Sequence, residues 1–448
     1  MIQTIISGAI VLALAFVTSS CDVKADDLAE YRGMKYGFFA HYAWGGPTYP
    51  VTVNPDGSVP KNLDDLANRF DAEGFAADLD SMGVEYVLFT AWHANMNLMY
   101  PSAQMERWRP GHSSKRDVLR DLIEACRAKG IRVLLYTHPR DGHDFSKEDQ
   151  IRTGFEPLNY QRWNDFINSI YGELMDRYGR DILGVYIDEG GKNDKYVDYP
   201  RLRETIKLRG NNPVIMQNDY GNLYSCDMGN KEIYYNGAFG LPESEKWPGL
   251  KTPVSIVIGS IFWAATAKGR QTPISQSPQV AFNPMVRYSP ESMFRYTVLQ
   301  AATNCDGGGT LWAAGPYPGG GWEMDVKERM QALGKMIKPV ERAIKRTYPS
   351  NSYVTEAGKG IGDLTWGVAT RSIDDNHEYI HVLKPLSGRS LALPPPADGK
   401  RFRSATFVSD GRSVRIAQAR TGVTLALNDG DSWSALDTVI DLVVSRRN

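Results

Sequence analysis

A chain of 448 residues is too long for one ordinary hydrophobic core, so two domains are expected. Hydrophobic residues make up 42% and charged residues 23% of the chain, the usual composition of a globular protein. The formal net charge of −1 gives no strong field that would attract nucleic acid or anionic lipid, so neither is an expected partner.

The N-terminal segment has the pattern of a secretion signal. Residues 5–17 form an apolar run that is too short to span a membrane but long enough for the core of a signal peptide. Residues 18–21 (TSSC) resemble a lipoprotein cleavage box in which Cys21 is lipidated, and cleavage after Ala25 is the alternative. We therefore expect residues 1–25 to be a signal segment and the mature protein to be exported, to the periplasm or, with a lipid anchor, to the outer membrane or cell surface. No later run is long enough for a membrane span.

Short apolar strands alternate with helical patterns from about residue 35 to residue 340. Helical patterns occupy residues 71–82 and 160–178, and Ser289-Pro290-Glu291 opens another helix. This alternation predicts parallel strands joined by crossover helices. The expected strands are residues 35–40, 86–90, 132–136, 184–188, 213–216 and 310–313.

Polar residues at the ends of these strands favour a closed barrel over a doubly wound sheet. His41, His93, His138 and Asp188 each follow or close one of the first strands, and no G-x-G-x-x-G motif follows the first strand. A barrel gathers its active site at the C-terminal ends of its strands. We therefore predict a catalytic (β/α)₈ barrel of the TIM type over residues 26–346.

The last hundred residues change character. Runs such as residues 379–383 and 438–444 have no helical period and are separated by Gly, Asp, Asn and Pro. This pattern predicts a C-terminal antiparallel β-sandwich over residues 347–448.

Asp188 is the strongest candidate for a catalytic residue. It closes an apolar strand and precedes Glu189-Gly190-Gly191, so its carboxylate is expected at the barrel mouth with room for a ligand. A helix cap or a salt bridge at the end of the strand is the structural alternative. His41, His93 and His138, at equivalent strand ends, are expected to point into one pocket. Neutral imidazole suits sugar hydroxyls, and a metal site is the competing use of clustered histidines. The sequence has no H-x-H or H-x-x-x-H pair beside them, so we predict neither a metal nor a cofactor.

Glycoside hydrolysis requires a second carboxylic acid to protonate the leaving oxygen. The candidates are Asp227, Glu232, Glu243 and Glu245. Glu232 has the best context, because the apolar and aromatic residues 233–235 follow it, and desolvation raises the pKa of a carboxyl group.

The motifs resemble, in their order, those of the α-L-fucosidase family of retaining glycoside hydrolases, over about residues 36–444. Residues 35–41 (KYGFFAH) are similar to the family's K-F-G-I-F-I-H-W-G strand, and residues 90–93 (TAWH) stand where the family has T-A-K-H-H-D-G-F. Residues 185–188 (VYID) resemble the strand that ends in the family's nucleophilic Asp. The other similar segments are residues 121–130, 135–136, 171–179, 214–219, 225–232, 309–316, 379–383 and 436–442.

Several residues depart from the family pattern. Ala94 and Asn95 replace the family's second His and its Asp, and Tyr42 replaces the Trp of H-W-G. Tyr220 replaces the Arg of N-D-R, and residues 251–256 lack the Glu of the family's W-E-T segment. These positions help to line the sugar pocket in relatives, so the departures leave fucose specificity and the acid/base residue open.

The resemblance implies a two-step displacement with retention of configuration on an oligosaccharide or polysaccharide substrate. Asp188 is the implied nucleophile, and Glu232 is the expected acid/base, with the carboxyl groups about 5 Å apart. The implied substrate-binding residues are His41, Trp44, Trp92, His93, His138 and Trp263, of which Trp92 and Trp263 are expected to form a stacking wall.

Three alternatives remain. The first is an exo-glycosidase for an α-L-galactoside, an arabinopyranoside or a substituted fucose, as the altered residues 90–97 suggest. The second is a carbohydrate-binding relative without activity, as the missing Glu suggests, although the retained Asp188 argues against this. The third is a metal-dependent hydrolase, as the clustered histidines allow.

Overall fold

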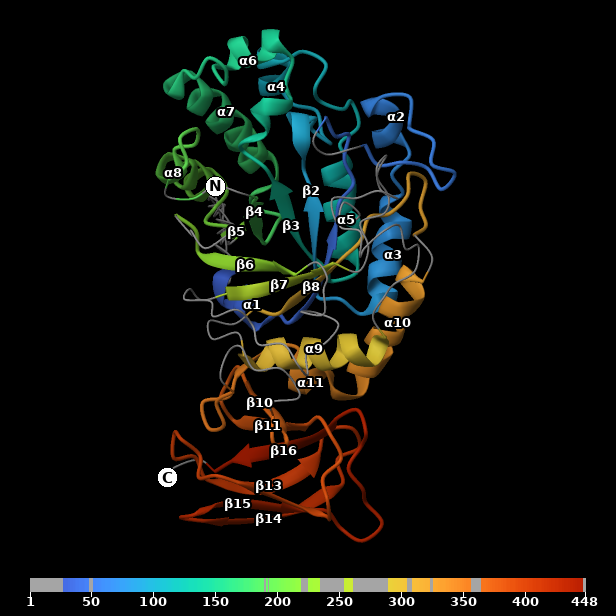
Figure 1. Ribbon diagram of the computed structural model, residues 1–448, viewed down its shortest axis with the longest axis vertical. Helices are drawn as coiled ribbons and strands as arrows, with labels where there is room; N and C mark the ends of the chain where they lie inside the picture. Colours follow the sequence, from blue (N-terminus) through green and yellow to red (C-terminus); the bar gives the residue numbers. More distant parts are fainter. Residues whose placement is uncertain are drawn as a thin grey trace, which may run out of the picture.

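A computed structural model describes residues 27–47, 51–188, 191, 193–218, 225–233, 254–260, 289–303, 308–322, 325–355 and 364–445, without the side chains of residues 231–233 and 254–260. Figure 1 shows a barrel above a separate antiparallel sheet. The predicted signal segment lies outside the described residues. Within them, no helix is both long and apolar enough to cross a membrane.

The predicted barrel is confirmed. Parallel strands pair in sequence order, and the barrel closes where Tyr36 of the first strand stands in register with Thr310 of the last. The strands are β1 (Tyr36–Ala40), β2 (Tyr86–Thr90), β3 (Arg132–Thr137), β4 (Gly184–Ile187), β5 (Val214–Asn218), β6 (Met228–Ile233), β7 (Val254–Ser260) and β8 (Thr310–Ala313). Strands β6 and β7 were not located from the sequence.

Helices surround the barrel, and polar side chains cap several of their N-termini. Asp71, Asp117 and Asn159 each accept a hydrogen bond from the backbone N–H three residues further on, which satisfies one free donor of the first turn. The helices are α1 (Asp27–Gly33), α2 (Leu63–Asn68), α3 (Ala72–Met82), α4 (Ala103–Trp108), α5 (Val118–Ala128), α6 (Lys147–Thr153), α7 (Tyr160–Tyr178), α8 (Tyr199–Arg209), α9 (Pro290–Thr303), α10 (Val326–Ile337) and α11 (Glu341–Ile344).

Two apolar layers hold the barrel together. Alternate strand residues fill its interior, among them Phe39, Leu88 and Leu134, and their sequence neighbours pack outward against the helices. The interior is tight, because a Cβ at Gly37 would come within 2.5 Å of the ring of Tyr86. The barrel is therefore a filled core, and the space for a ligand lies at the ends of its strands.

The C-terminal β-sandwich is also confirmed. Its strands run in the order β12-β15-β14-β13-β16-β11-β10-β9 and form one antiparallel sheet. Leu391 and Leu425 at one end of that order share a core with Ile380 and Ile440 from the other end, so the sheet folds over itself into two layers. The strands are β9 (Thr347–Pro349), β10 (Gly367–Ser372), β11 (His377–Val382), β12 (Ser390–Leu393), β13 (Phe402–Phe407), β14 (Ser413–Ala419), β15 (Gly422–Ala426) and β16 (Thr438–Val444).

The sandwich packs beneath the barrel, away from the C-terminal ends of the barrel strands (Figure 1). Helices α9 and α11 lie between the two parts and contact β9 and β10. The carbonyl of Ala343 accepts a 2.6 Å hydrogen bond from the hydroxyl of Thr370. The sandwich therefore lies on the side of the barrel opposite the candidate site. The exact domain boundary, between residues 346 and 347, stays a prediction.

Candidate active site

Asp188 lies at the barrel mouth, directly after β4. Its backbone N–H donates a 2.9 Å hydrogen bond to the carbonyl of Thr137 on the neighbouring strand β3. The residue is 9% exposed. Its position is therefore fixed by the barrel ladder rather than by a loop.

Two strands beside β4 supply hydrogen-bond donors to the carboxylate of Asp188. The side-chain amide of Asn218, at the end of β5, donates a 2.7 Å hydrogen bond to Oδ1. The hydroxyl of Tyr136, on β3, donates to Oδ2. Hydrogen bonds to a charged acceptor are shorter and stronger than neutral ones, so this pair fixes the direction of both oxygens.

Tyr136 also forms the floor of the site. Its ring stacks on Tyr186 at a centroid distance of 5.4 Å and on His93 at 5.1 Å. Burial, followed by the nearby charge of Asp188, raises the pKa of Tyr136 well above its usual value. The phenol therefore stays protonated and remains a donor to Asp188 at any working pH.

The histidines that follow the first strands come together, as their positions in the sequence led us to expect. The ring centroids of His41 and His93 are 5.1 Å apart, and those of His93 and His138 are 5.6 Å apart. The ring of His41 also meets Tyr136 edge to face at 4.8 Å. The cluster therefore stands beside the tyrosine that holds Asp188.

Two of these imidazoles are neutral at neutral pH. Burial, helped by repulsion from His138, lowers the pKa of His41 to about 3. Burial and the other nearby histidines lower the pKa of His93 well below its usual value. The Nδ1 atom of His93 accepts a 2.7 Å hydrogen bond from the N–H of Ala94, so the proton of the neutral ring is on Nε2. The Nε2–H of this neutral ring is therefore a hydrogen-bond donor.

His138 is held by its own loop. Its Nδ1 atom lies 3.2 Å from Oδ1 of Asp141 and 3.4 Å from the N–H of Arg140. Its backbone carbonyl accepts a 3.0 Å hydrogen bond from the indole of Trp92. Within the described residues, no group of three or more His, Cys, Asp or Glu side chains has the arrangement of a metal site.

The expected stacking role of Trp92 is wrong. Trp92 is fully buried in the layer between barrel and helices, and its ring meets Tyr171 of α7 edge to face at 5.2 Å. In the loop after β2, His93 faces the other histidines, whereas its neighbour Trp92 packs against the helices. Trp44, by contrast, stays partly exposed in the loop after β1. The second expected stacking residue, Trp263, lies outside the described residues.

The candidates for the acid separate clearly. Asp227 lies before β6, at the end of the barrel opposite the mouth, and is paired with Arg203 at 2.7 Å and Lys207 at 2.5 Å. Burial favours a higher pKa for Asp227, but hydrogen bonds from Lys207, the N–H of Ile215 and Arg203 outweigh it and lower the pKa. Asp227 is therefore a structural ion-pair partner and was wrong as a candidate acid. The backbone of Glu232 lies on β6, and its side chain is outside the described part, as are Glu243 and Glu245.

Tyr136 and Asn218 were missed as site residues by sequence reasoning. Both lie at the C-terminal ends of barrel strands, which was the available signal. A Tyr in an apolar strand and an Asn after a Gln do not stand out until the register aligns them with Asp188.

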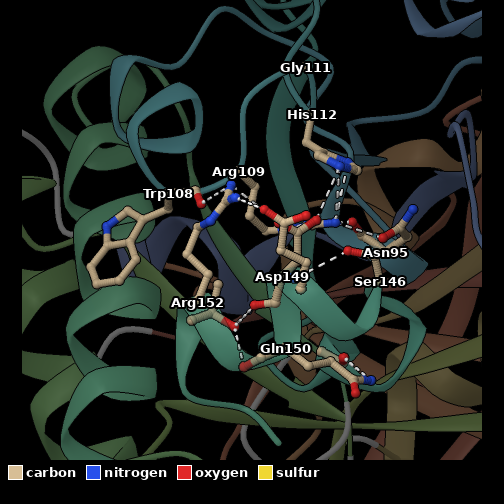
Figure 2. Close-up of polar contacts among 12 residues, drawn as sticks. Asn95, Trp108, Arg109, Gly111, His112, Ser146, Asp149, Gln150 and Arg152 are labelled. Carbon is tan, nitrogen blue, oxygen red and sulfur yellow. Dashed lines mark hydrogen bonds and ion pairs between the residues drawn. The ribbon is translucent and has the colours of Figure 1, made fainter.

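A buried arginine fixes the loop after His93 (Figure 2). Arg109 is fully buried, and its guanidinium donates 2.8 Å hydrogen bonds to both the carbonyl and the side-chain oxygen of Asn95. Its Nε lies 3.3 Å from Oδ2 of Asp149, and its Cζ lies 3.4 Å from the centre of the Phe145 ring. Asn95 has a left-handed φ of 63°, a conformation that Asn tolerates better than most residues.

The loops after β1 and β2 are joined to one another. The side-chain amide of Asn97 donates to the carbonyl of Trp44 at 3.0 Å. A Cβ at Gly46 would come within 2.9 Å of the Cβ of Asn95, so glycine permits this close approach. The loops that carry His41 and His93 therefore form one continuous wall.

Comparison with known proteins agrees with this arrangement. Residues 63–252 match the family model described as Alpha-L-fucosidase, and this segment carries His93, His138, Asp188 and Asn218. No curated protein sequence matches the chain.

Solved structures that resemble the chain include α-L-fucosidase isoenzyme 1 from Paenibacillus thiaminolyticus, with a TM-score of 0.64, 16% identity, and coverage of 94% of this chain and 99% of that one. An α-L-fucosidase from Bacteroides thetaiotaomicron has a TM-score of 0.62 and 18% identity, over 94% of this chain and 95% of the other. The α-fucosidase of Thermotoga maritima has a TM-score of 0.59 and 16% identity, over 93% and 96%. At these identities the structural likeness establishes the fold.

Proposed function

Because this chain is a divergent relative of the α-L-fucosidase family of glycoside hydrolases, we propose that it is an exported, retaining α-L-fucosidase acting on glycans or polysaccharide fragments. One observation carries the proposal. The carboxylate of Asp188 is held by Tyr136 and Asn218 at the barrel mouth, beside a cluster of histidines.

In the first step, an oxygen of Asp188 attacks the anomeric carbon while the bond from that carbon to the leaving oxygen breaks. A carboxylic acid transfers its proton to the leaving oxygen in the same step. In the second step, the same group, now a carboxylate, takes a proton from water, and the water oxygen displaces Asp188 from the anomeric carbon. Tyr136 and Asn218 stabilise the carboxylate that leaves in this second step.

Glu232 is the proposed acid/base. Asn230 of β6 is in register with Asn218, the residue that bonds to Asp188, and Glu232 follows two residues later on the same strand. This register supports a position near the nucleophile. Retention requires the two carboxyl groups to be about 5 Å apart.

The named relatives support a covalent route. The Bacteroides thetaiotaomicron α-L-fucosidase has been solved as a trapped covalent intermediate, and the Thermotoga maritima enzyme with a mechanism-based inhibitor. Neutral His41 and His93 suit the binding of sugar hydroxyls, because neutral imidazole donates and accepts without a fixed charge.

A second candidate function is an exo-glycosidase for an α-L-galactoside, an arabinopyranoside or a substituted fucose. Ala94 is buried and stands where the family has its second His, so this chain lacks an imidazole there. A pocket altered at this point suits a sugar with different substituents.

Hydrolysis of a panel of nitrophenyl glycosides tests both candidates. Turnover of the α-L-fucopyranoside supports fucosidase activity, and turnover confined to the α-L-galactoside or the arabinopyranoside supports the second candidate. Proton NMR of the first sugar released tests retention, which predicts the α-anomer before mutarotation. A β-anomer as the first product contradicts double displacement.

Export rests on the sequence of residues 1–25. Mass spectrometry of the protein isolated from both the membrane and the soluble fractions of its native host tests it. Lipidated Cys21 as the first residue supports a lipoprotein, an N-terminus after Ala25 supports a released protein, and an intact leader contradicts export.

A further inference from the structure

A cavity that contains none of the candidate catalytic residues lies beside the barrel mouth. Its volume is about 820 Å³, within the roughly 300–1,000 Å³ of small-ligand sites. It lies between the loops after β1 and β2 and the helices α4 and α7. Its lining includes Trp44, Asn95, Asn97, Ala103 and His112, but none of the three clustered histidines or Asp188.

The loops that follow His41 and His93 line this cavity. Asn95 follows His93 by two residues, and Trp44 follows His41 by three. Asn97 ties these loops together through its hydrogen bond to the carbonyl of Trp44. The loops that carry His41 and His93 therefore also line this cavity, which is the basis for expecting it to serve the same substrate.

The acidic groups of the cavity wall are already engaged with the protein. Glu106 accepts a 2.9 Å hydrogen bond from the N–H of Gly111 and a 2.6 Å hydrogen bond from the hydroxyl of Ser113. Glu173 accepts 2.9 Å and 3.2 Å hydrogen bonds from the N–H groups of Ala103 and Gln104 at the start of α4. Both carboxylates are therefore already hydrogen-bonded to nearby backbone N–H groups of the protein.

The basic groups are engaged as well. Lys115 pairs with Asp64 at 3.3 Å, and Arg177 pairs with Asp117 at 2.5 Å. The wall carries three carboxylates (Asp64, Glu106 and Glu173) and these two basic groups, so a strongly anionic ligand such as a sulfate ester gains little there.

Two of the lining residues, His112 and Asn95, lie beside the buried Arg109 (Figure 2). The Nδ1 atom of His112 lies 2.7 Å from the side-chain oxygen of Asn97. Since an amide oxygen only accepts, the ring donates this hydrogen bond and its proton is on Nδ1. Burial and the charge of Arg109 lower the pKa of His112 to about 4, so the ring is neutral from pH 5 upward. The side chain of His112 keeps 25% of its surface exposed, and the ring of Trp44 is partly exposed as well.

Amides, a neutral imidazole, hydroxyls and an aromatic ring are the groups that bind a neutral sugar, which offers hydroxyls at its edge and an apolar face. We propose that this cavity binds a neutral sugar residue of the glycan substrate, next to the residue that is cleaved. The inference rests on the proposed glycosidase function, and it defines the substrate as an oligosaccharide rather than a simple glycoside.

The test is to fill the cavity without touching the active site. Ala103 is exposed on the first turn of α4 and lines the cavity, so Ala103→Trp places an indole inside it. Ala128→Trp is the matched control, because Ala128 is exposed at the end of α5 and does not line the cavity. Thermal unfolding of both variants checks that each folds.

Binding is measured first, by calorimetry in the Asp188→Asn background, so that it does not depend on hydrolysis. The probes are neutral trisaccharides that end in α-L-fucose, α-L-galactose or arabinopyranose, the methyl glycosides of these sugars, and a sulfated fucosyl trisaccharide. We expect Ala103→Trp to weaken the best neutral trisaccharide at least tenfold, and Ala128→Trp and every methyl glycoside to change less than twofold.

Three outcomes overturn the inference: no neutral trisaccharide binds more tightly than its methyl glycoside, Ala103→Trp and Ala128→Trp have equal effects, or only the sulfated probe responds to Ala103→Trp. A chain that binds trisaccharides in this way but hydrolyses none refutes the proposed function and leaves the cavity as a sugar site. With active protein, Ala103→Trp raises KM for the trisaccharide and leaves kinetics with the nitrophenyl glycoside unchanged.

Discussion

The side-chain amide of Asn218 donates a 2.7 Å hydrogen bond to Oδ1 of Asp188, from the strand next to the one that Asp188 follows. A neutral amide in this position donates a hydrogen bond to the carboxylate and places no second negative charge beside it. A second carboxylate in the same place would have the opposite effect, because two close carboxyl groups share a proton and the pKa of one of them rises.

We therefore predict that Asn218→Asp moves the acidic limb of the pH profile of kcat/KM to higher pH, by at least one unit. The nucleophile has to be ionised, and a neighbouring carboxylate delays its ionisation as pH rises. The measurement is kcat/KM with the best aryl glycoside from pH 4 to pH 8, with Asn218→Ala as the uncharged comparison. An unchanged acidic limb in Asn218→Asp would show that the two side chains are not coupled.

Tyr136→Phe removes one hydrogen bond to Asp188 and leaves the stacked ring in place. A hydrogen bond to a charged group contributes about 1.5–3 kcal/mol, so we expect kcat/KM to fall roughly 10- to 100-fold. The melting temperature should stay close to that of wild type, because the contacts with Tyr186 and His93 are retained. Undiminished kcat/KM in Tyr136→Phe would mean that this bond does not support the nucleophile.

Arg109→Met is expected to destabilise the fold by about 3–5 kcal/mol, because it leaves buried Asp149 without its nearest cation and frees the loop at Asn95. Urea unfolding measures the change. Arg201→Met is the matched control, since Arg201 pairs with Asp165 at 2.7 Å on the exposed surface and should cost less than about 1 kcal/mol. Equal losses in the two variants would remove the distinction between the buried and exposed pairs.

The depressed pKa of His41, about 3, makes stability depend on pH in a fixed direction. The unfolded chain binds a proton at this residue below about pH 6.5, and the folded chain does not until about pH 3. The free energy of unfolding therefore falls as pH falls through this window, by up to about 1.4 kcal/mol per pH unit from this residue. His41→Gln should show a shallower decline between pH 6 and pH 4 in urea unfolding. Identical slopes would mean that folding does not change the protonation of His41 in this pH range.

The sequence predicted what depends on strand order and failed where packing direction decides. His41, His93, His138 and Asp188 were located because strand ends of a barrel converge, whichever side chains fill the core. Trp92 was misassigned because it adjoins His93 in sequence but faces the helices. Both residues lie in the loop after β2, and a motif does not specify the direction of side chains in a loop.

The strands β6 (MGNKEI) and β7 (VSIVIGS) illustrate a second limit. Polar residues in β6 hide its strand character, although its backbone completes the barrel between β5 and β7. The roles of Tyr136 and Asn218 are likewise invisible in one dimension, since they arise from register between β3, β4 and β5.

The most direct test of the account is chemical rescue of Asp188→Ala with azide, using p-nitrophenyl α-L-fucopyranoside, or the glycoside that wild type prefers. The account predicts that the variant is inactive alone, and that azide, entering the space left by the carboxylate, restores nitrophenol release and yields the glycosyl azide with inverted configuration. Two results would contradict the assignment of Asp188 as the nucleophile. One is substantial hydrolysis by Asp188→Ala without azide, and the other is a product of retained configuration when azide is present.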